Sequence, residues 1–508
     1  MTWSEGTVQS NGAEKRPEGL ILVRLAAELT IKSRRTRASF QRQLVRNLRD
    51  ALKTTGAAFE VEGGWSRLYV RTDSPETLPT LTRVFGVSSI SPVEVIVPAR
   101  LEEIVRAGEE AFRDRVRDRE FAVRARRSGQ HPFSSKDIEI QLGAALLPHA
   151  KGVNLDHPEV TVYVEVQEGA AYLFSERIPG PGGLPVGVEG NAVALLSGGY
   201  DSAVASWLML KRGIALDYVF CNLGGDAYER AVVQVAKVLA DDWSYGTRPR
   251  LHVVDFGEVL TELRRKAKQS YWQVVLKRLM YRVASKIGAE LGADAIITGE
   301  AIGQVSSQTL ANLRAIEPAA DLPVFRPLLG FDKEEIIERA RHIGTAALSE
   351  QVKEYCAIAP GKPVTAAREE AVASEEARLD LSVLDAAVAA RKVLDLRALT
   401  PTDLVAPYLF IDEIPEGAVV FDCRPIEQYR AWHLPGAEHK DEWELLQRFR
   451  QLDRDRVYVL YCAHGIQTAY IAEKMQRMGY EAYSFRGGMR GILKYAQEKG
   501  LLPRGFRP

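Results

Sequence analysis

The chain has 508 residues, which is too long for one ordinary hydrophobic core, so we expect roughly three or four domains. Its hydrophobic fraction of 46% and charged fraction of 26% are those of soluble globular domains, and no run of about 18 apolar residues could span a bilayer. The four cysteines include no CxxC pair and are too few and scattered for a structural zinc or iron–sulfur site. A formal net charge of zero excludes a global attraction to nucleic acid, so any RNA contact must be local.

The N-terminal third is predicted to form small α+β units. Residues 1–19 are polar and lack an apolar signal core, which indicates a disordered lead of a cytoplasmic protein. Residues 20–50 hold a strand and then a helix with apolar residues at helical spacing, and carry eight Lys or Arg against two acids. Further strands are expected at 58–64, 66–73, 84–98 and 120–129, with a helix at 101–119 and a hairpin at 158–175, before a Pro/Gly linker at 179–190.

From residue 191 the pattern changes to apolar strands that alternate with helices. Such alternation is typical of an open parallel sheet built from βαβ units, and we assign residues 191–364 to it. A charged, Ala-rich helical linker is predicted at 365–402. Residues 403–508 show a second, smaller α/β pattern, so we start the last domain there.

The segment Leu195–Ser202, LLSGGYDS, lies where a buried strand should turn into a helix. Gly198 and Gly199 let the backbone approach a ligand, while the N–H groups of a helix start and the Ser197 hydroxyl can bind phosphate oxygens. The segment lacks the lysine of the GxxxxGK[ST] motif, which argues against a kinase-like grip on the terminal phosphates. The alternative is a tight turn in which a polar side chain only caps the helix.

Three downstream residues are candidates to complete an anion site. Gly299 precedes a polar loop at the edge where open parallel sheets bind ligands. Lys277 and Lys333 could neutralise phosphate charge. Isolated lysines on helices are more often solvated, so the residues alone leave both roles open.

Cys462 follows an apolar run and precedes a helix. Backbone N–H groups and the helix N-terminus at such a turn stabilise a thiolate, which predicts a nucleophilic cysteine, with a buried inert thiol as the alternative. Cys221 and Cys423 lie in apolar strands and are predicted to be core residues. Cys356 lies at a helix-to-loop transition and, by composition alone, is also a core or incidental residue.

Five ordered segments resemble the bacterial tRNA 4-thiouridine sulfurtransferase (ThiI) family over nearly the whole chain. AAELTIKSRRTRASF resembles its ferredoxin-like domain and FAVRARRSGQHPFSSKDIEIQLGAAL its THUMP domain; SGGYDS, GEAIGQVSSQT and DKEEII resemble its PP-loop domain; EYCAIA and YCAHGIQT match its two working cysteines. The resemblance implies a multidomain α/β and α+β fold. Its parts are a ferredoxin-like unit at 20–72, a THUMP RNA-binding domain at 73–178, a doubly wound parallel PP-loop ATP pyrophosphatase sheet at 191–364 and a rhodanese-like domain at 403–508.

The resemblance also implies site residues. It assigns catalysis to Cys462, Cys356, Asp201 and Lys333, with Asp201 helping to hold Mg²⁺. The implied ATP-binding residues are Leu195, Leu196, Ser197, Gly198, Gly199, Asp201, Ser202, Lys277, Gly299 and Gln308. The implied tRNA contacts are Arg124, Arg126, Arg127, His131 and Lys136, beside Phe133, which either stacks on a base or packs.

The implied reaction is an ATP-dependent transfer of persulfide sulfur from Cys462 to uridine in tRNA, which yields 4-thiouridine through an adenylated uridine. Cys356 either attacks the persulfide and releases sulfide, or pairs with Cys462 as the sulfur leaves, and both routes end in a Cys356–Cys462 disulfide. The cofactors expected are ATP and Mg²⁺, without an iron–sulfur cluster. The partners expected are tRNA, a cysteine desulfurase, the sulfur carrier ThiS of thiamine biosynthesis and a thiol reductant, with no membrane; a homodimer is one assembly that we consider.

Two other functions remain open. The chain could deliver sulfur only to the thiamine-pathway carrier, which needs little more than the rhodanese-like domain. It could instead be a non-catalytic THUMP RNA-binding protein whose ATP and thiol sites are relics, although the retained loop residues and both cysteines argue against this. A relative that makes 2-thiouridine is disfavoured by the attached rhodanese-like domain and by the lack of further grouped cysteines.

Overall fold

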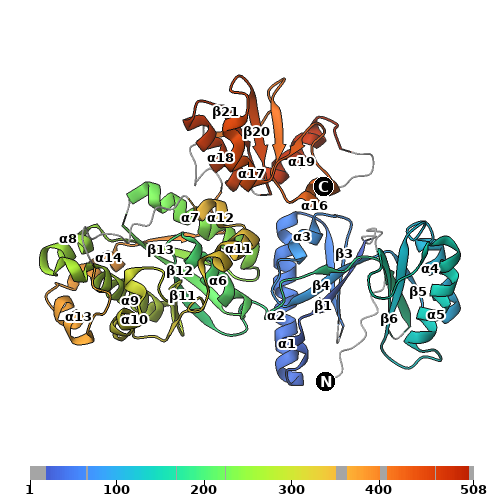
Figure 1. The fold of residues 1–508 in the computed structure, drawn as a ribbon, viewed down its shortest axis with the longest axis horizontal. Coiled ribbons are helices and arrows are strands. Elements are labelled where there is room, and N and C mark those ends of the chain that lie inside the picture. Colours follow the sequence, from blue (N-terminus) through green and yellow to red (C-terminus); the bar gives the residue numbers. More distant parts are fainter. Residues whose placement is uncertain are drawn as a thin grey trace, which may run out of the picture.

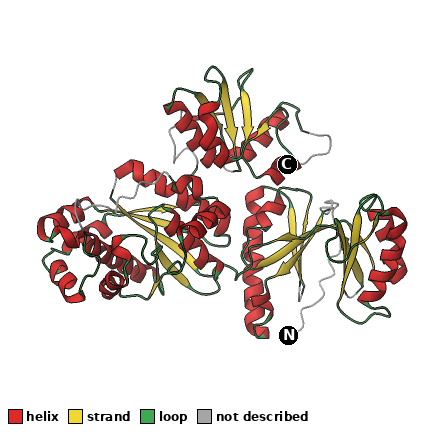
Figure 2. Ribbon diagram, viewed as in Figure 1, coloured by secondary structure: helices red, strands yellow, loops and turns green. Residues whose placement is uncertain are grey.

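The computed structural model describes residues 19–64, 67–167, 169–223, 225–350, 363–400, 409–463 and 465–502. Four separate β-sheets, each with its own covering helices, divide this part of the chain into four domains (Figures 1 and 2). The predicted multidomain mixture of α+β and α/β units is therefore confirmed. None of the helices in the described ranges is long and apolar enough to cross a bilayer.

The first domain is an antiparallel sheet in the order β10-β4-β1-β3-β2. Apolar β1 (Leu20–Leu25) lies at its centre, and the apolar side of α2 (Arg34–Thr55) covers the sheet. The predicted boundary at residue 73 cuts this domain, because β4 (Val87–Val93) pairs with β1. The remaining elements are α1 (Ala27–Thr30), β2 (Phe59–Gly63), β3 (Arg67–Thr72), α3 (Thr77–Leu81) and β10 (Ile178–Pro179), which lies at the start of the predicted linker.

The second domain is a mixed sheet in the order β5-β9-β8-β6-β7. Its strands are β5 (Val95–Pro98), β6 (Glu120–Arg127), β7 (Gly152–Val153), β8 (Val160–Val166) and β9 (Ala170–Phe174). Helices α4 (Leu101–Phe112) and α5 (Ser135–Leu146) contribute Ile104, Phe112 and Leu142 to the core that they share with the sheet. A capping box at Ser134 fixes the start of α5.

The third domain has the sheet order β15-β14-β11-β12-β13-β16. Five strands are parallel, namely β11 (Asn191–Leu195), β12 (Ala215–Asn222), β13 (Arg250–Asp255), β14 (Ile296–Ile297) and β15 (Val324–Phe325). Separate apolar cores lie on the two faces. The first face is covered by α6 (Tyr200–Lys211), α7 (Gly225–Trp243), α11 (Lys333–Ile343) and α12 (Ala346–Ser349), the second by α8 (Gly257–Lys266), α9 (Trp272–Leu291) and α10 (Leu310–Ile316).

The stretch 365–402, predicted to be a helical linker, instead completes the third domain where it is described. Its helices α13 (Glu369–Glu376) and α14 (Ser382–Ala389) contribute to the second core, and β16 (Lys392–Asp395) pairs antiparallel with β13. Buried Glu376 binds both Arg278 and Arg282 of α9, at 2.8 and 2.7 Å. The prediction was wrong because charged residues that suggested a solvated linker instead form ion pairs with the third domain.

The fourth domain is an all-parallel sheet in the order β17-β21-β20-β18-β19. The strands are β17 (Phe410–Ile411), β18 (Val419–Asp422), β19 (Glu438–His439), β20 (Val457–Tyr461) and β21 (Glu481–Phe485). Its helices are α16 (Ile426–Ala431), α17 (Glu442–Arg448), α18 (Ile466–Arg477) and α19 (Gly488–Glu498). Each face of the sheet has its own apolar core, although Phe410 of β17 and Ala469 of α18 belong to the core of the third domain.

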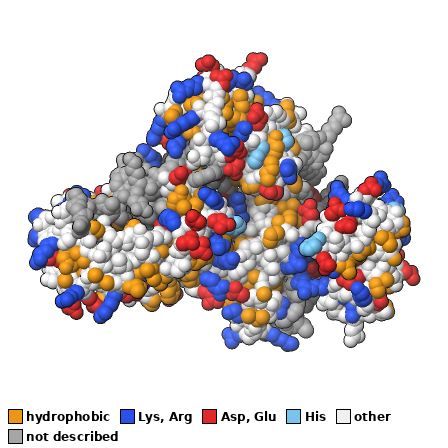
Figure 3. All heavy atoms as spheres, in the orientation of Figure 1, with side chains coloured by type: hydrophobic (Ala, Val, Ile, Leu, Met, Phe, Trp, Pro, Cys, Tyr) orange, Lys and Arg blue, Asp and Glu red, His pale blue; other side chains and the backbone are white. Residues whose placement is uncertain are grey.

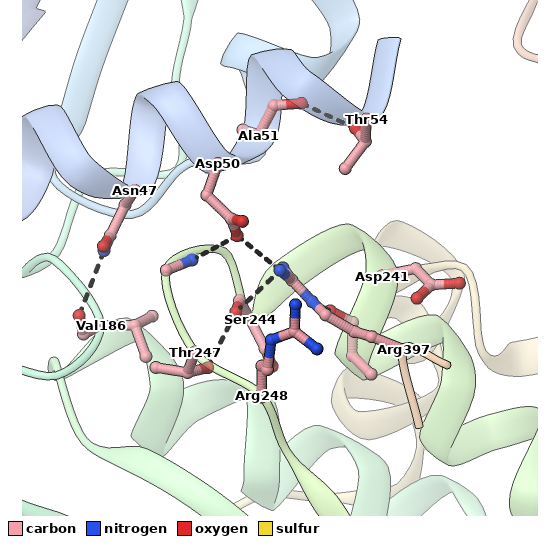
Figure 4. Close-up of polar contacts among 12 residues, drawn as sticks. Asn47, Asp50, Ala51, Thr54, Val186, Asp241, Ser244, Thr247, Arg248 and Arg397 are labelled. Carbon is pink, nitrogen blue, oxygen red and sulfur yellow. Dashed lines mark hydrogen bonds and ion pairs between the residues drawn. The ribbon is translucent and has the colours of Figure 1, made fainter. Parts of the chain in front are cut away.

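Ion pairs, buried on one side and partly exposed on the other, join the first domain to its neighbours. Glu165 of β8 pairs with Arg24 of β1 at 2.6 Å and with Arg67 of β3 at 3.0 Å, which joins the first two sheets. On the other side, Asp50 of α2 pairs with Arg397 at 2.5 Å and accepts the Gly246 N–H at 2.7 Å (Figure 4). Because charged pairs withdrawn from water have specific geometry, these contacts fix how the first domain is placed between the second and the third.

The fourth domain lies above the junction of the first and third domains (Figure 1). Helix α17 packs against α12, and Ala347 of α12 contacts the fourth domain's core. Arg83, near the end of α3, pairs with Asp242 of α7 at 2.6 Å beneath this domain. On the face drawn in Figure 3, Lys and Arg are interspersed with acidic side chains, in keeping with the zero net charge.

Candidate active site

The LLSGGYDS segment forms the strand-to-helix turn that the sequence predicts. Gly198 has φ 76°, a conformation that favours glycine, and Gly199 precedes the first turn of α6. The Ser202 hydroxyl accepts the Ser197 N–H at 3.1 Å and donates to the Gly199 carbonyl at 3.2 Å. No side chain caps the start of α6, so the capping alternative is wrong, and the Ser202 bonds instead hold the shape of the turn against which a cavity lies.

A cavity of about 340 Å³ lies against this turn. Leu195, Leu196, Ser197, Gly199, Asp201, Ser202, Lys277, Gly299, Gln308 and Lys333 all line it, which brings together nearly all the predicted nucleotide residues. Gly198 belongs to the turn itself without lining the cavity. The sheet edge supplies this convergence, because parallel strands end on the same side and their following loops meet there.

Gly299 is required by a close approach between two elements. A Cβ at this position would lie 2.5 Å from the Asp201 carbonyl carbon and 2.6 Å from the Ser202 nitrogen. The loop after β14 therefore lies directly against the first turn of α6. Any larger residue would push the loop away from the turn and change the shape of the cavity.

Three polar atoms that face the cavity have no hydrogen-bond partner within the described part of the chain. They are Glu300 Oε1, Gln304 Nε2 and Ser349 Oγ, all in residues that line the cavity. An unpaired buried polar group costs about 1–3 kcal/mol, so such groups indicate a site shaped for a polar ligand. A nucleotide offers donors and acceptors that could pair with these atoms.

Glu300 is a buried carboxylate at the centre of a charged network. Its exposed fraction is 2%, and its oxygens lie 3.0 Å from Arg326 Nε and 3.7 Å from Lys277 Nζ. Burial raises the pKa of this carboxyl, but Lys277, the Tyr281 hydroxyl and Arg326 outweigh burial and hold the pKa below its ordinary value. Glu300 is thus ionised at neutral pH and places the Lys277 ammonium at the cavity wall.

Asp201 and Lys333 face each other across the cavity mouth. Lys333 is the first residue of α11, whose start is fixed by a capping box at Asp332, and its Nζ lies 2.9 and 3.0 Å from the two Asp201 oxygens. Both side chains are partly exposed, so ligand phosphates can compete for this pair. Among the described residues, no three His, Cys, Asp or Glu side chains converge as a metal site would require.

Cys462 is at the turn between β20 and α18, as predicted. Its Sγ accepts the Gly465 N–H at 3.2 Å and lies 3.5 Å from the Thr468 hydroxyl oxygen. Both groups can stabilise negative charge on sulfur, which favours a thiolate. The Cys462 thiol is only 1% exposed, so its surroundings shield it from solvent. The predicted partner, Cys356, lies outside the described residues.

The predicted RNA-binding residues lie at one end of the second domain. Arg124, Arg126 and Arg127 are exposed on β6, and exposed Lys136 lies on α5, 3.6 Å from Glu139. Half-buried His131 stacks on Phe133, whose side chain is 7% exposed and belongs to the core. Packing, rather than base stacking, is therefore the role that the structure gives Phe133.

Several cavity residues escape prediction from the sequence. Glu300, Gln304 and Ser349 carry the atoms without a hydrogen-bond partner, and Cys221, predicted to be a core residue, also lines the cavity. Glu300 and Gln304 lie within the GEAIGQVSSQT segment, so the family resemblance of that segment could have identified them. Nothing in the local sequence marks Ser349 or Cys221, because their positions depend on how distant elements meet.

Four family profiles match the chain in the order of its domains. They are the ThiI ferredoxin-like domain at residues 20–91, the THUMP domain at 98–176, the thiamine biosynthesis protein (ThiI) at 187–381 and the rhodanese-like domain at 407–495. The matched ranges follow the order of the four sheets, and the first range includes most of β4.

Curated relatives match over nearly their full lengths. The tRNA sulfurtransferase of Pyrobaculum aerophilum is 39% identical over 92% of this chain and 96% of its own. The tRNA sulfurtransferase of Yersinia enterocolitica is 36% identical over 90% of this chain and 98% of its own. The prediction named a bacterial family. The relatives include archaeal as well as bacterial proteins, so the resemblance is not specific to bacteria.

Two solved structures resemble much of the chain. A 4-thiouridine synthetase–RNA complex with bound ATP shares 34% identity and a TM-score of 0.65, covering 74% of this chain and 99% of that chain. PH1313 from Pyrococcus horikoshii shares 29% identity and a TM-score of 0.52, covering 64% of this chain and 99% of that chain. With the domain order, the cavity at the SGGYDS turn and relatives that match from end to end, the chain belongs to the tRNA sulfurtransferase (ThiI) family and is a sulfurtransferase enzyme that thiolates tRNA.

Proposed function

We propose that this enzyme uses ATP to adenylate a uridine of tRNA at O4 and then replaces that oxygen with sulfur, giving 4-thiouridine. The observation that carries the proposal is the cavity at the SGGYDS turn, where cationic side chains, helix-start N–H groups and unpaired polar atoms converge. The uridine C4 oxygen is a poor leaving group, so its exchange requires prior activation. The similar 4-thiouridine synthetase, solved in complex with RNA and ATP, supports this choice of nucleotide and product.

The turn residues suit the pyrophosphate part of ATP. The backbone of Gly198 and Gly199 and the hydroxyls of Ser197 and Ser202 would bind phosphate oxygens at the start of α6. Lys333 would leave Asp201 for the phosphates and stabilise charge during transfer of AMP. Lys277, Gln308 and the strand ends at Leu195 and Leu196 would complete the nucleotide pocket.

Mg²⁺ suits the same turn, because Asp201 is a carboxylate at the cavity mouth and oxygen ligands are what this ion prefers. Released from Lys333, Asp201 would provide one ligand, and phosphate oxygens and water would provide the others. A bound Mg²⁺ would supply neutralisation of phosphate charge. We expect no iron–sulfur cluster in the reaction.

The sulfur is proposed to arrive as a persulfide on Cys462, loaded by a cysteine desulfurase. The Gly465 N–H and the Thr468 hydroxyl would stabilise the thiolate that accepts it. Cys356 would then either attack this persulfide to release sulfide or pair with Cys462 as sulfur leaves. Both routes end in a Cys356–Cys462 disulfide, which a thiol reductant reopens.

The tRNA is proposed to bind through its acceptor region to the second domain. Exposed Arg124, Arg126, Arg127 and Lys136, with His131, would contact its phosphates. We place the enzyme in the cytoplasm, where tRNA and reducing thiols coexist, and propose a homodimer as its assembly.

A second activity is proposed for the fourth domain, namely sulfur delivery to the ThiS carrier of thiamine biosynthesis. This domain carries Cys462 on a sheet of its own, which favours the activity, because Cys462 chemistry can then proceed without the ATP cavity. Cys462→Ser should cause thiamine auxotrophy, whereas Asp201→Ala should not. Prototrophy of the Cys462 variant would contradict this activity.

The main proposal is tested with purified enzyme, unmodified tRNA, Mg·ATP, cysteine and a cysteine desulfurase. The tRNA is digested, and 4-thiouridine is quantified by mass spectrometry. We expect the product only when ATP is present, and none from Asp201→Ala or Cys462→Ser. A deletion strain complemented with Cys356→Ala should lack 4-thiouridine, and normal levels there would overturn the two-cysteine route. Absence of product with the unaltered enzyme would overturn the whole proposal.

A further inference from the structure

Cys423 and Cys462 occupy equivalent positions at the ends of two adjacent parallel strands. Strand β18 pairs with β20 in the register Phe421↔Leu460 and Asp422↔Tyr461, so the next residues of the two strands are the two cysteines. The Cys423 N–H donates to the Tyr461 carbonyl at 2.8 Å, so the two chain segments are adjacent where the cysteines follow the strands.

The two thiols also lie on the same face of the sheet. Side chains alternate between faces along a strand, and Phe421, Cys423, Leu460 and Cys462 all belong to the core on one side, whereas Tyr461 belongs to the other. Neighbouring strands are about 4.7–4.9 Å apart. A disulfide spans Cα atoms about 4.4–6.8 Å apart, so adjacent strands bring two such residues within its reach.

Their surroundings give the two thiols different resting states. Burial raises the pKa of the Cys423 thiol well above its ordinary value, and the neighbouring Cys462 and Asp422 raise it further. Cys423 therefore rests as a neutral thiol. Cys462 instead has the Gly465 N–H directed at its sulfur. Both cysteines are buried, with exposed fractions of 3% and 1%.

We propose that Cys423 is a second resolving cysteine, which discharges a persulfide on Cys462 from within the same domain. The inference rests on the proposed function, because that function puts the persulfide there. Attack by Cys423 needs no movement between domains. It would clear the sulfur when no activated uridine accepts it, in competition with Cys356.

The step balances without an outside oxidant. The Cys423 thiol loses its proton, and its sulfur bonds to Cys462 Sγ. The bond between Sγ and the outer sulfur breaks, and the outer sulfur leaves with the electron pair and takes up a proton as hydrosulfide. The outer sulfur is reduced by two electrons, and the two cysteines are oxidised to a disulfide. A dithiol reductant restores both thiols by exchange.

The test compares full-length Cys356→Ser with the double variants Cys356→Ser/Cys423→Ser and Cys356→Ser/Cys423→Val. The serine variant keeps a polar group and the valine variant keeps an apolar one, so a shared effect follows from loss of the thiol. Each protein is loaded with inorganic polysulfide, desalted under anaerobic conditions, and then alkylated in denaturant at intervals. Mass spectrometry measures the Cys462 persulfide and any peptide linked through Cys423 and Cys462, and released sulfide is assayed in parallel.

In Cys356→Ser we expect the persulfide to decay with equal amounts of sulfide and linked peptide. Without Cys423 we expect it to persist at least about tenfold longer, since the attacking thiol is gone. Equal decay in all three proteins, or decay without the linked peptide, would overturn the role of Cys423 while the proposed function stands. Failure of Cys462 to take up sulfur at all would overturn both.

Discussion

Asp201 and Lys333 form an ion pair, with Nζ–O distances of 2.9 and 3.0 Å, although 132 positions separate them in the chain. Each lies in the first turn of a helix on the same face of the third sheet, α6 for the acid and α11 for the base. The pair closes the mouth of the cavity that we assign to ATP. Because a phosphate must displace the acid from the base, each side chain has a separate role once ligand binds.

Replacing Lys333 with Met should reduce tRNA thiolation about 100-fold or more, because a positive group that faces developing phosphate charge is removed. Protein stability should change by less than about 1 kcal/mol, since the pair is partly exposed. Single-turnover formation of 4-thiouridine and urea unfolding measure the two effects. Lys286→Met is the matched control, because that lysine pairs with Asp385 away from the cavity. Equal activity of both variants would contradict the role of Lys333.

Glu300→Ala should destabilise the third domain by about 3–5 kcal/mol, because removal of this buried carboxylate leaves Arg326 without its central partner. The Glu300 pKa is lowered in the folded protein, so its stabilising contribution is present above the pKa of the unfolded chain and is lost as the pH falls through the folded value. Urea midpoints measured between pH 7 and pH 3 should fall less steeply for Glu300→Gln than for the unaltered enzyme. Parallel pH profiles would show that Glu300 is not ionised in the fold.

The local elements of the nucleotide site could be predicted because they depend on short-range chemistry. A buried strand, two glycines and a helix start define the turn at Gly198 without reference to the rest of the chain. Gly299 and Lys277 were only candidates from the residues alone, and the family resemblance assigned them to the nucleotide site. Their contacts with Asp201 and Glu300 arise from packing of elements that are far apart in sequence.

The stretch 365–402 shows where reasoning from composition fails. Its charges are typical of an exposed helix, yet Glu376 is buried beside two arginines and β16 forms the edge of a sheet. Whether a charged residue is solvated or paired depends on what faces it, and that is a property of the fold. For the same reason the residues on β4 gave no sign that they belong to the first sheet.

Substituting Arg124 and Arg126 together with Ala should weaken tRNA binding and lower the salt slope, d log K/d log[salt], by about 0.7–0.9 for each phosphate that the protein no longer neutralises. Both side chains are exposed, so the fold should not change. Filter binding from about 50 to about 300 mM KCl provides the comparison. Arg106→Ala is the control, because this exposed arginine of α4 pairs with Glu103 outside the proposed surface. An unchanged slope in the double variant would exclude β6 from the tRNA interface.

The junction below the fourth domain contains a carboxyl group whose charge state should depend on docking. Glu442 is the first residue of α17. The charges of Asp441, Asp242 and Arg83 act on its carboxyl group. Burial and the neighbouring carboxylates of Asp441 and Asp242, opposed by Arg83, together raise the pKa of Glu442 to about 8. Arg83 is itself paired with Asp242 at 2.6 Å, so it cannot fully neutralise Glu442.

Docking of the fourth domain should therefore weaken as the pH rises. The docked state holds a proton on Glu442 that an undocked, solvated carboxyl releases near its ordinary pKa of 4.5, so docking is fully favoured below that value and loses stability up to about pH 8. For one proton the docking equilibrium changes at most about tenfold per pH unit in this window.

Energy transfer between dyes on the second and fourth domains, followed from pH 6 to pH 9, measures the docked fraction. Glu442→Gln should stay docked at every pH, whereas Glu444→Gln, on the exposed side of the same helix, should behave like the unaltered enzyme. A pH response that survives in Glu442→Gln would assign the titration to another group.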